Sequence, residues 1–341
     1  MSFKIGWVGC GRHATQMLLP QLAPNNVTLA AVCDVNPLAA QAAATHYGVS
    51  AVYNDYRQLL EHPGLHAIGM AVGPELHQTI AIAALQRGLP VFIEKPPGGS
   101  AKAAREIAAT AHRAGVPAYV GFMKRYSTGN KIAGNILRSG DFGPILGFQG
   151  NYLTAPGYFS GAVDYSSFYL HHCVHYMDLM PWLVGAEISD LQARAFEHQP
   201  GRLLAHLNMT FANGALGTLV MGTVQSRGTP MENITVMGDH QRIEVNNVIN
   251  VAWHRDPPFK AEDDAARLDN SCDTLCWSPN FTAAANEDHK GYHALLRDVF
   301  RGMKGKSSQA PTIEDGAQAM LNLERMIVAI EQQLHNPSLS H

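Results

Sequence analysis

Three histidines fall close together in the sequence, at His171, His172 and His175, with Asp178 just beyond them. On a helix, His171, His175 and Asp178 stand at positions i, i+4 and i+7 and share one face, whereas His172 points about 100° away. Such a face suits a pair of imidazoles for proton transfer. As two histidines and one carboxylate it also suits a zinc, manganese or iron ion. Buried structural histidines are the third interpretation.

A glycine-rich turn directly follows the first expected strand. Gly9-Cys10-Gly11-Arg12-His13-Ala14 fits the pattern G-x-G-x-x-G/A, in which Gly9 permits a tight turn and Gly11 lets the backbone approach a pyrophosphate. The helix that starts here would offer N–H groups and a positive dipole end to the phosphates. About 20 residues further on, Asp34 ends the second expected strand, where its carboxylate would bind the adenosine ribose and repel a 2′-phosphate. The turn therefore predicts NAD, with NADP disfavoured.

Short apolar runs supply the elements that must position these residues. In the first third of the chain they alternate with Ala-rich segments of helical length, which is typical of a parallel sheet with crossover helices. The expected strands are residues 3–8, 28–33, 67–72, 90–93 and 118–120. The expected helices are residues 15–22, 37–47, 76–87 and 101–114, the last capped by Ser100 and ended by Gly115.

After residue 121 the pattern changes to β-rich runs separated by Gly or Asn turns. The expected strands are residues 203–211, 215–223, 233–237, 242–245 and 248–253. Strands that follow one another without helices form an antiparallel sheet, so we expect a second domain of α+β type. A polar, Asp-rich segment at residues 254–289 is expected as a long loop, and helices at 292–303 and 313–334 follow it.

Composition excludes several classes of protein. Of 341 residues 46% are hydrophobic, and 25 basic residues nearly balance 28 acidic ones, which argues against a nucleic-acid binder. The length favours two domains. The sequence shows neither a cationic leader nor a run of about 18 apolar residues, and its five cysteines are scattered, so we expect a cytoplasmic protein with free thiols. Cys272 and Cys276, with His289 and His293 as nearest partners, make a poor zinc site.

Glu94-Lys95-Pro96 follows an apolar strand in this Rossmann-like setting, and with it the chain resembles the Gfo/Idh/MocA oxidoreductases along nearly its whole length. Further matching pieces are the Gly9 motif, Asp34, Gly73-Pro74-Glu75-Leu76-His77, Arg125, the run from Val174 to Leu179, the run from Ile234 to Val245 and Glu314-Asp315-Gly316. The resemblance implies an α/β Rossmann NAD-binding domain at residues 1–122. It also implies an α+β substrate and oligomerisation domain at residues 123–341, with an open, mostly antiparallel sheet and a C-terminal helix able to pack back on the Rossmann domain.

The resemblance also implies what the site residues do. The family oxidises a hydroxyl on a sugar or cyclitol or reduces the ketone, and hydride transfer needs a base near the hydroxyl proton. His175 matches the family's catalytic His, and Lys95 would hydrogen-bond the same oxygen and stabilise its negative charge. The catalytic set is Lys95, His175 and His171. The expected cofactor-binding residues are Gly9, Cys10, Gly11, Arg12, His13, Asp34, Gly73, Pro74, His77, Glu94 and Lys95. The expected substrate-binding residues are Lys95, Arg125, Tyr152, Asp164, His171 and His175, and no metal is expected.

The chain departs from its family just before His175. Where most members have Asp-x-Gly-x-His, this chain has His171-His172-Cys173-Val174-His175, so His171 replaces the Asp and Cys173 the Gly. That Asp helps to position the substrate and to tune the catalytic His, and Asp164 is a candidate replacement carboxylate. In the acid/base interpretation His171 contacts substrate hydroxyls and Asp178 orients an imidazole.

Several other residues have two interpretations each, a substrate contact or a structural role. For Lys124 and Arg125 the structural role is a pair with a domain-interface carboxylate. For Tyr152, Tyr158, Tyr165 and Trp277 it is packing against apolar neighbours.

The function expected from these features is that of an NAD-dependent dehydrogenase for a sugar, sugar acid, cyclitol or glycoside. One alternative is an NAD-dependent enzyme that cleaves glycosides by transient oxidation and elimination. Another is a non-catalytic NAD-binding regulator, which the presence of Lys95 and His175 disfavours. Apolar strands in an open sheet pair readily with a second subunit, so we expect a homodimer or homotetramer through the C-terminal sheet.

Overall fold

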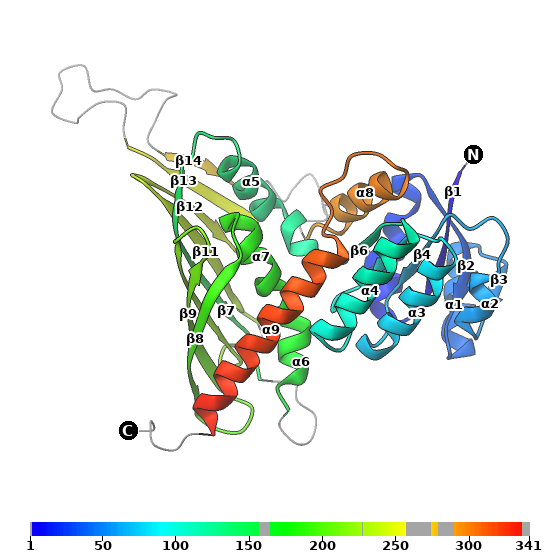
Figure 1. Cartoon of the computed structure of the whole chain (residues 1–341), viewed down its shortest axis with the longest axis horizontal. Helices are drawn as coiled ribbons and strands as arrows, with labels where there is room; N and C mark the ends of the chain where they lie inside the picture. The colour runs from blue at the N-terminus through cyan, green and yellow to red at the C-terminus, as the bar shows by residue number, and fades with distance from the viewer. Residues whose placement is uncertain (1, 157–163, 227, 257–273, 279–289, 336–341) are drawn as a thin grey trace. The chain divides into compact units, whose positions relative to one another are not determined.

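The computed structural model describes residues 2–156, 164–226, 228–256, 274–278 and 290–335 (Figure 1). The chain forms two compact units. Unit 1 contains residues 1–123 and 291–324, and unit 2 contains residues 124–290 and 325–341. Helix α8 (Tyr292–Met303) therefore belongs to unit 1, and helix α9 (Ile313–Leu334) contributes residues to both units.

Unit 1 contains a six-stranded sheet in the order β3-β2-β1-β4-β5-β6, in which every pair of neighbours is parallel. The strands are β1 (Phe3–Val8), β2 (Val27–Cys33), β3 (Ala51–Tyr53), β4 (Ala67–Met70), β5 (Val91–Ile93) and β6 (Ala118–Val120). This is the order of a Rossmann fold, and the expected fold class is confirmed. The chain order reverses between β1 and β4, where dinucleotides bind in such sheets.

The helices of unit 1 match the expected ones except at the glycine turn and at α2, a short helix that the sequence does not predict. They are α1 (Pro37–Tyr47), α2 (Tyr56–Leu60), α3 (Pro74–Gln86), α4 (Ala101–Ala114) and α8. Ser100 caps α4 by accepting a hydrogen bond from the Ala103 N–H at 3.1 Å, as the sequence predicts. The prediction of a single helix at residues 15–22 is wrong. The structure has a π-helix, η1 (Ala14–Leu18), followed by a 3-10 helix, η2 (Leu19–Gln21). Pro20 lacks an N–H and cannot continue an α-helical ladder here.

Unit 2 contains an eight-stranded sheet in the order β14-β13-β12-β11-β7-β10-β9-β8. Its strands are β7 (Ile145–Leu153), β8 (Ile188–Glu197), β9 (Leu203–Phe211), β10 (Leu216–Gly222), β11 (Met231–Gly238), β12 (Gln241–Asn246), β13 (Asn250–His254) and β14 (Thr274–Trp277). Only β7 and β10 run parallel, and the other six pairs are antiparallel. The mostly antiparallel second sheet is thus confirmed.

Helices cover one face of this sheet. Figure 1 shows α5 (Thr128–Leu137) and α7 (Val174–Val184) lying on it. A short helix, α6 (Ser166–Phe168), and a π-helix, η5 (Tyr169–Cys173), lead directly into α7. Along β7 the buried Phe148 and Tyr152 alternate with the exposed Gln149, as expected for a sheet with one covered and one open face. None of the helices in the described ranges is long and apolar enough to cross a membrane.

Candidate active site

The glycine turn after β1 is tied to the end of β2. Gly9 has φ of +91°, and a Cβ there would lie 2.2 Å from the carbonyl oxygen of Ala71, so only glycine fits. The Cys10 N–H donates to Oδ2 of Asp34 at 2.7 Å, and the Asn36 N–H donates to Oδ1 at 2.8 Å. The structure thus brings together two residues that the sequence assigns to the cofactor, Cys10 and Asp34.

The rest of the turn leaves room for a nucleotide. A Cβ at Gly11 would meet nothing within 4 Å, so the backbone there is open to an approaching phosphate. Burial, with the charge of Asp34 as a second cause, raises the pKa of the Cys10 thiol to about 12, which keeps this position neutral. A tight glycine turn, an open backbone stretch and a carboxylate at the end of β2 together fit NAD.

Two more of the expected cofactor residues contact each other. Nε2 of His13 lies 3.2 Å from Oε1 of Glu94, whose side chain is only 5% exposed. The His13 ring also meets Tyr292 of α8 edge-on, with centroids 5.6 Å apart. Arg12 is exposed and donates to Gln16 one helical turn on, at 3.0 Å. His13 therefore links the glycine turn to the segment that carries Lys95.

His77, also expected at the cofactor, is buried and contacts the backbone with both ring nitrogens. Its Nδ1 donates to the carbonyl of Pro96 at 2.8 Å, and its Nε2 accepts from the Val72 N–H at 3.2 Å. Burial lowers the pKa of His77, so the ring is neutral. Gly73 and Pro74 begin α3 beside it, as its N-cap and first residue. The imidazole joins the end of β4 to the residue that follows Lys95.

The histidine cluster lies in two different helical segments. His171 and His172 belong to the π-helix η5, and His175 and Asp178 belong to α7. His171 is exposed, whereas His175 is 4% and Asp178 3% exposed. A π-turn has wider i→i+5 bonding, so α-helical spacing does not hold across the junction. His171 and His175 thus differ in their surroundings, although the sequence predicts one shared face.

Asp178 pairs with Arg125. Nε of Arg125 donates to Oδ2 of Asp178 at 2.8 Å, and the second guanidinium nitrogen contacts Oδ1. Both side chains are nearly buried, at 9% and 1% exposed. The carboxylate expected to orient an imidazole thus faces a guanidinium. In the described ranges, no three His, Cys, Asp or Glu side chains are arranged to hold a metal ion.

Unit 2 also contains a polar cluster that is not evident from the sequence, the inner polar cluster of Lys124, Tyr152, His172, Tyr176 and Glu232. The ammonium of Lys124 pairs with Oε1 of Glu232, which also accepts from the Tyr176 hydroxyl at 2.6 Å. The Tyr152 hydroxyl lies 2.7 Å from Nδ1 of His172, and their rings stack with centroids 5.5 Å apart. Glu232 was missed, although a charged residue pointing inward from an apolar strand is a recognisable signal.

The remaining expected residues lie elsewhere in unit 2. Asp164 is exposed and accepts from the N–H and hydroxyl of Ser166 at 2.8 and 2.7 Å, which lowers the pKa of its carboxyl. Tyr165 donates to Glu197 at 2.5 Å. Trp277, 37% exposed, lies on β14 within the segment expected as a loop. Tyr158, Cys272, His289 and most of the expected loop lie outside the described residues.

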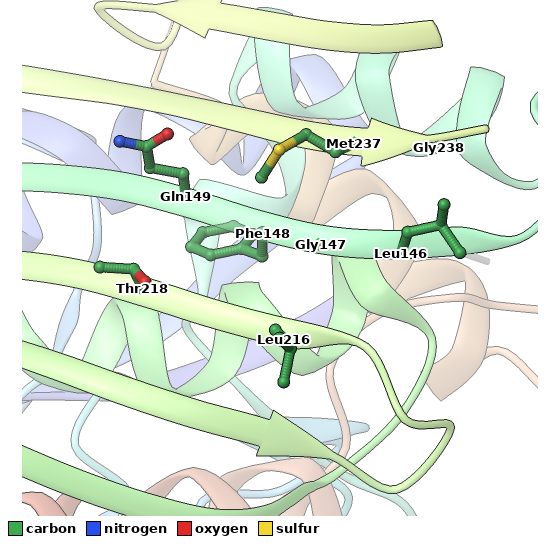
Figure 2. A pocket seen from close by; sticks show the side chains of 8 residues that line it. All are labelled: Leu146, Gly147, Phe148, Gln149, Leu216, Thr218, Met237 and Gly238. Carbon is green, nitrogen blue, oxygen red and sulfur yellow. The ribbon is translucent and has the colours of Figure 1, made fainter. Parts of the chain in front are cut away.

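A shallow groove on the open face of the second sheet contains none of the expected site residues. Figure 2 shows its lining on three neighbouring strands, β7, β10 and β11. The lining residues are Leu146, Gly147, Phe148, Gln149, Leu216, Thr218, Met237 and Gly238. This largely apolar surface lacks groups for proton transfer.

Two family profiles match the chain, one on each side of residue 130. Residues 3–122 match "Oxidoreductase family, NAD-binding Rossmann fold", and residues 137–334 match "Oxidoreductase family, C-terminal alpha/beta domain", both of the Gfo/Idh/MocA group. Together the two matches cover well over half of the chain.

Curated relatives include inositol 2-dehydrogenases. That of Salmonella typhimurium is 31% identical over 194 residues, 55% of this chain and 56% of the relative. Inositol 2-dehydrogenase 2 of Saccharopolyspora erythraea is 30% identical over 204 residues, 59% of this chain and 58% of the relative. The matched region thus spans somewhat over half of each relative's length.

Solved structures with the same fold cover nearly the whole chain. A dehydrogenase from Chromobacterium violaceum has a TM-score of 0.84 at 22% identity, covering 97% of this chain and 96% of that one. Levoglucosan dehydrogenase in complex with NADH and levoglucosan has a TM-score of 0.82 at 19% identity, covering 98% of both chains. At these identities the likeness establishes the fold.

Proposed function

Because the chain belongs to the Gfo/Idh/MocA oxidoreductase family, we propose that it is an NAD-dependent dehydrogenase acting on CH–OH groups. It transfers a hydride between NAD and a hydroxyl or ketone carbon of a sugar, sugar acid, cyclitol or glycoside. The observation that carries the proposal is the Gly9 turn hydrogen-bonded to Asp34, beside an open backbone at Gly11. The inositol 2-dehydrogenase relatives support a polyol substrate.

The residues around the cofactor have separate tasks. Gly9, Gly11 and Asp34 would hold NAD, which when bound supplies the hydride acceptor. Lys95, on the segment that follows β5, donates a hydrogen bond to the substrate oxygen and stabilises its developing negative charge. A ring nitrogen of His175 accepts the proton of the same hydroxyl. His77 positions the Lys95 segment through the carbonyl of Pro96.

Two aspects of unit 2 extend the proposal. Asp178 neutralises the buried guanidinium of Arg125, the residue after Lys124. We assign this ion pair a structural role, the positioning of α7, which carries Asp178. The open face of the sheet would join two or four copies of the chain into a homo-oligomer.

The proposal is tested by NADH formation with a panel of sugars and cyclitols. Lys95→Ala and His175→Ala should each lower kcat by about 10²–10⁴-fold, because each removes a group that acts on the hydroxyl proton or oxygen. In His175→Ala, NADH binding, followed by fluorescence, should stay near that of the parent protein. Lys102→Ala and His112→Ala, both exposed on α4, are matched controls and should leave turnover unchanged.

Turnover retained in both Lys95→Ala and His175→Ala would contradict the assigned roles. Release of a leaving group from a glycoside without net NADH would instead indicate the glycoside-cleaving alternative.

A further inference from the structure

The inner polar cluster contains an ion pair, Lys124 and Glu232, whose side chains could each form further hydrogen bonds. The side chains of Lys124 and Glu232 are 12% and 14% exposed, so both are largely withdrawn from water yet reachable. The ammonium has three N–H groups, and the single hydrogen-bond acceptor it contacts in the described residues is Oε1 of Glu232. Oε2 of Glu232 receives no hydrogen bond from the described residues, since Lys124 and Tyr176 both bind Oε1.

The surroundings hold these two groups in place. The Lys124 ammonium lies 5.5 Å from the ring centroid of Tyr152 and 5.4 Å from that of Tyr176, so two aromatic faces stabilise the cation. Burial and the charge of Glu232 hold the pKa of Tyr176 well above its usual value, so its hydroxyl remains a donor. Tyr152 and Glu232 are directly paired across β7 and β11. The pair therefore presents unused donors beside an unused acceptor on a rigid frame.

Neighbouring hydroxyls of a polyol match this arrangement. Each hydroxyl can donate one hydrogen bond and accept others, so one can accept from Lys124 while the next donates to Oε2 of Glu232. The cluster shares a helical segment with the proposed base, because Tyr176 directly follows His175 and His172 lies three residues before it.

The two cations Lys124 and Arg125 each pair with a carboxylate. Lys124 is compensated by Glu232, and Arg125 by Asp178, so the two adjacent cations add no net positive charge. A substrate carboxylate placed here would meet the unshielded oxygen of Glu232, and repulsion at such short range in a partly buried site is large. We infer that Lys124 and Glu232 form a hydroxyl-binding pair that selects an uncharged polyol over a sugar acid. This inference rests on the proposed function and narrows its substrate class.

The test compares neutral sugars with their uronic acids, which keep the same ring hydroxyls: D-glucose with D-glucuronate and D-galactose with D-galacturonate. Both kcat/KM and binding to the NADH-saturated protein by calorimetry are measured. The parent protein should prefer the neutral member of each pair. Glu232→Gln should weaken binding of the neutral sugar by at least about tenfold, since a hydrogen bond to a charged group is lost. It should also shift the preference from the neutral sugar toward the uronic acid.

Lys124→Met should shift the preference further toward the neutral sugar, because the negative charge of Glu232 then has no compensating cation and repels the uronic acid. Opposite shifts from the two partners are a result that a purely structural role would not produce, since loss of folding affects both sugars of a pair equally. Glu244→Gln is the matched control, because Glu244 also forms an ion pair, with Arg242, but on the open face of the sheet. Glu244→Gln should leave the ratio of neutral-sugar to uronic-acid binding unchanged.

Three results would overturn the inference: preference of the parent protein for the uronic acids, an unchanged ratio in Glu232→Gln, or failure of all four sugars to bind. Binding of the neutral sugars without NADH formation from any polyol would count against the proposed dehydrogenase alone. An unchanged ratio in an active enzyme would count against the hydroxyl-binding pair alone.

Discussion

At the scale of single residues, His77 shows how one buried side chain can organise a catalytic segment. It is 1% exposed, and its two nitrogens bind backbone groups at Val72 and Pro96, 24 positions apart. A neutral imidazole with a proton on Nδ1 donates from one ring nitrogen and accepts at the other, at a fixed spacing that the smaller amide group of Gln does not reproduce. Loss of that bridge leaves buried polar groups unpaired and loosens the segment of Lys95.

His77→Gln should therefore destabilise the protein by about 1–3 kcal/mol at neutral pH. The pKa of His77 is lowered from 6.5 by burial, so below pH 6.5 the unfolded chain takes up a proton that the folded chain refuses. This contribution to stability is complete above pH 6.5 and decreases as the pH falls toward the lowered value. The stability difference between parent and variant, from urea unfolding at pH 7.5 and 5.5, should narrow at the lower pH.

The control for this prediction is His112→Gln, because His112 is exposed on α4. A difference in stability between parent and His77→Gln that is the same at both pH values would contradict the neutral bridge. A kcat unaffected by His77→Gln in the folded protein would contradict its positioning role.

At the scale of elements, the glycine turn combines a folding role with a binding role, and two adjacent variants separate them. Gly9→Ala should lower stability by more than about 1 kcal/mol, because φ is +91° and the added Cβ would lie 2.2 Å from the oxygen of Ala71. Gly11→Ala should leave the melting temperature unchanged, since the Cβ meets nothing. It should still weaken NADH binding, measured by fluorescence titration, because it occupies the side open to the pyrophosphate.

Unchanged NADH affinity in Gly11→Ala would show that the phosphates bind elsewhere. A melting temperature that drops equally in both variants would show that the space around Gly11 is needed for folding.

Most elements of the Rossmann unit were predictable because local signals and tertiary packing agree there. The Ser100 cap and the Gly115 end of α4 are examples, with Gly115 at φ of +67°. Strand β3 was missed because its three half-buried residues give no periodicity. Strand β8 was missed because half of its 10 residues, Ile-Ser-Asp-Leu-Gln-Ala-Arg-Ala-Phe-Glu, are polar, and because its pairing with β9 is a long-range property.

The site shows the same division between local and long-range information. The turn at Gly9 and its carboxylate Asp34 follow from motif spacing, and the structure joins them. The pairing of Arg125 with Asp178 and of Lys124 with Glu232 could not be derived, because 53 and 108 positions separate the partners. The π-helix before α7, which contains His171, could not be predicted either, because this element has no recognised sequence signal.

At the scale of the whole molecule, the open face of the second sheet leaves apolar side chains exposed. Leu216 on β10 and Met237 on β11 both pair with Gly147 of β7, so they lie on one face, 65% and 36% exposed. Phe196 of β8 lies on the same face according to the register of β9 and β10, but at the level of Gly222 rather than Leu216, and is 58% exposed. Exposed apolar side chains gathered on a β-sheet, as at Leu216 and Met237, typically mark a protein interface.

A second copy of the chain is the expected occupant, because a two-fold interface lets one self-complementary face bury itself. Light scattering should then give a multiple of the single-chain mass for the parent protein. Leu216→Lys should shift that mass toward one chain, since a lysine beside Met237 on this face must be desolvated to keep the contact. Val328→Lys replaces a similarly exposed apolar residue on α9 and should leave the assembly intact. A single-chain mass for the parent protein would contradict this interface. Dissociation of the assembly by Val328→Lys as well would show that the interface is not confined to the open face of the sheet.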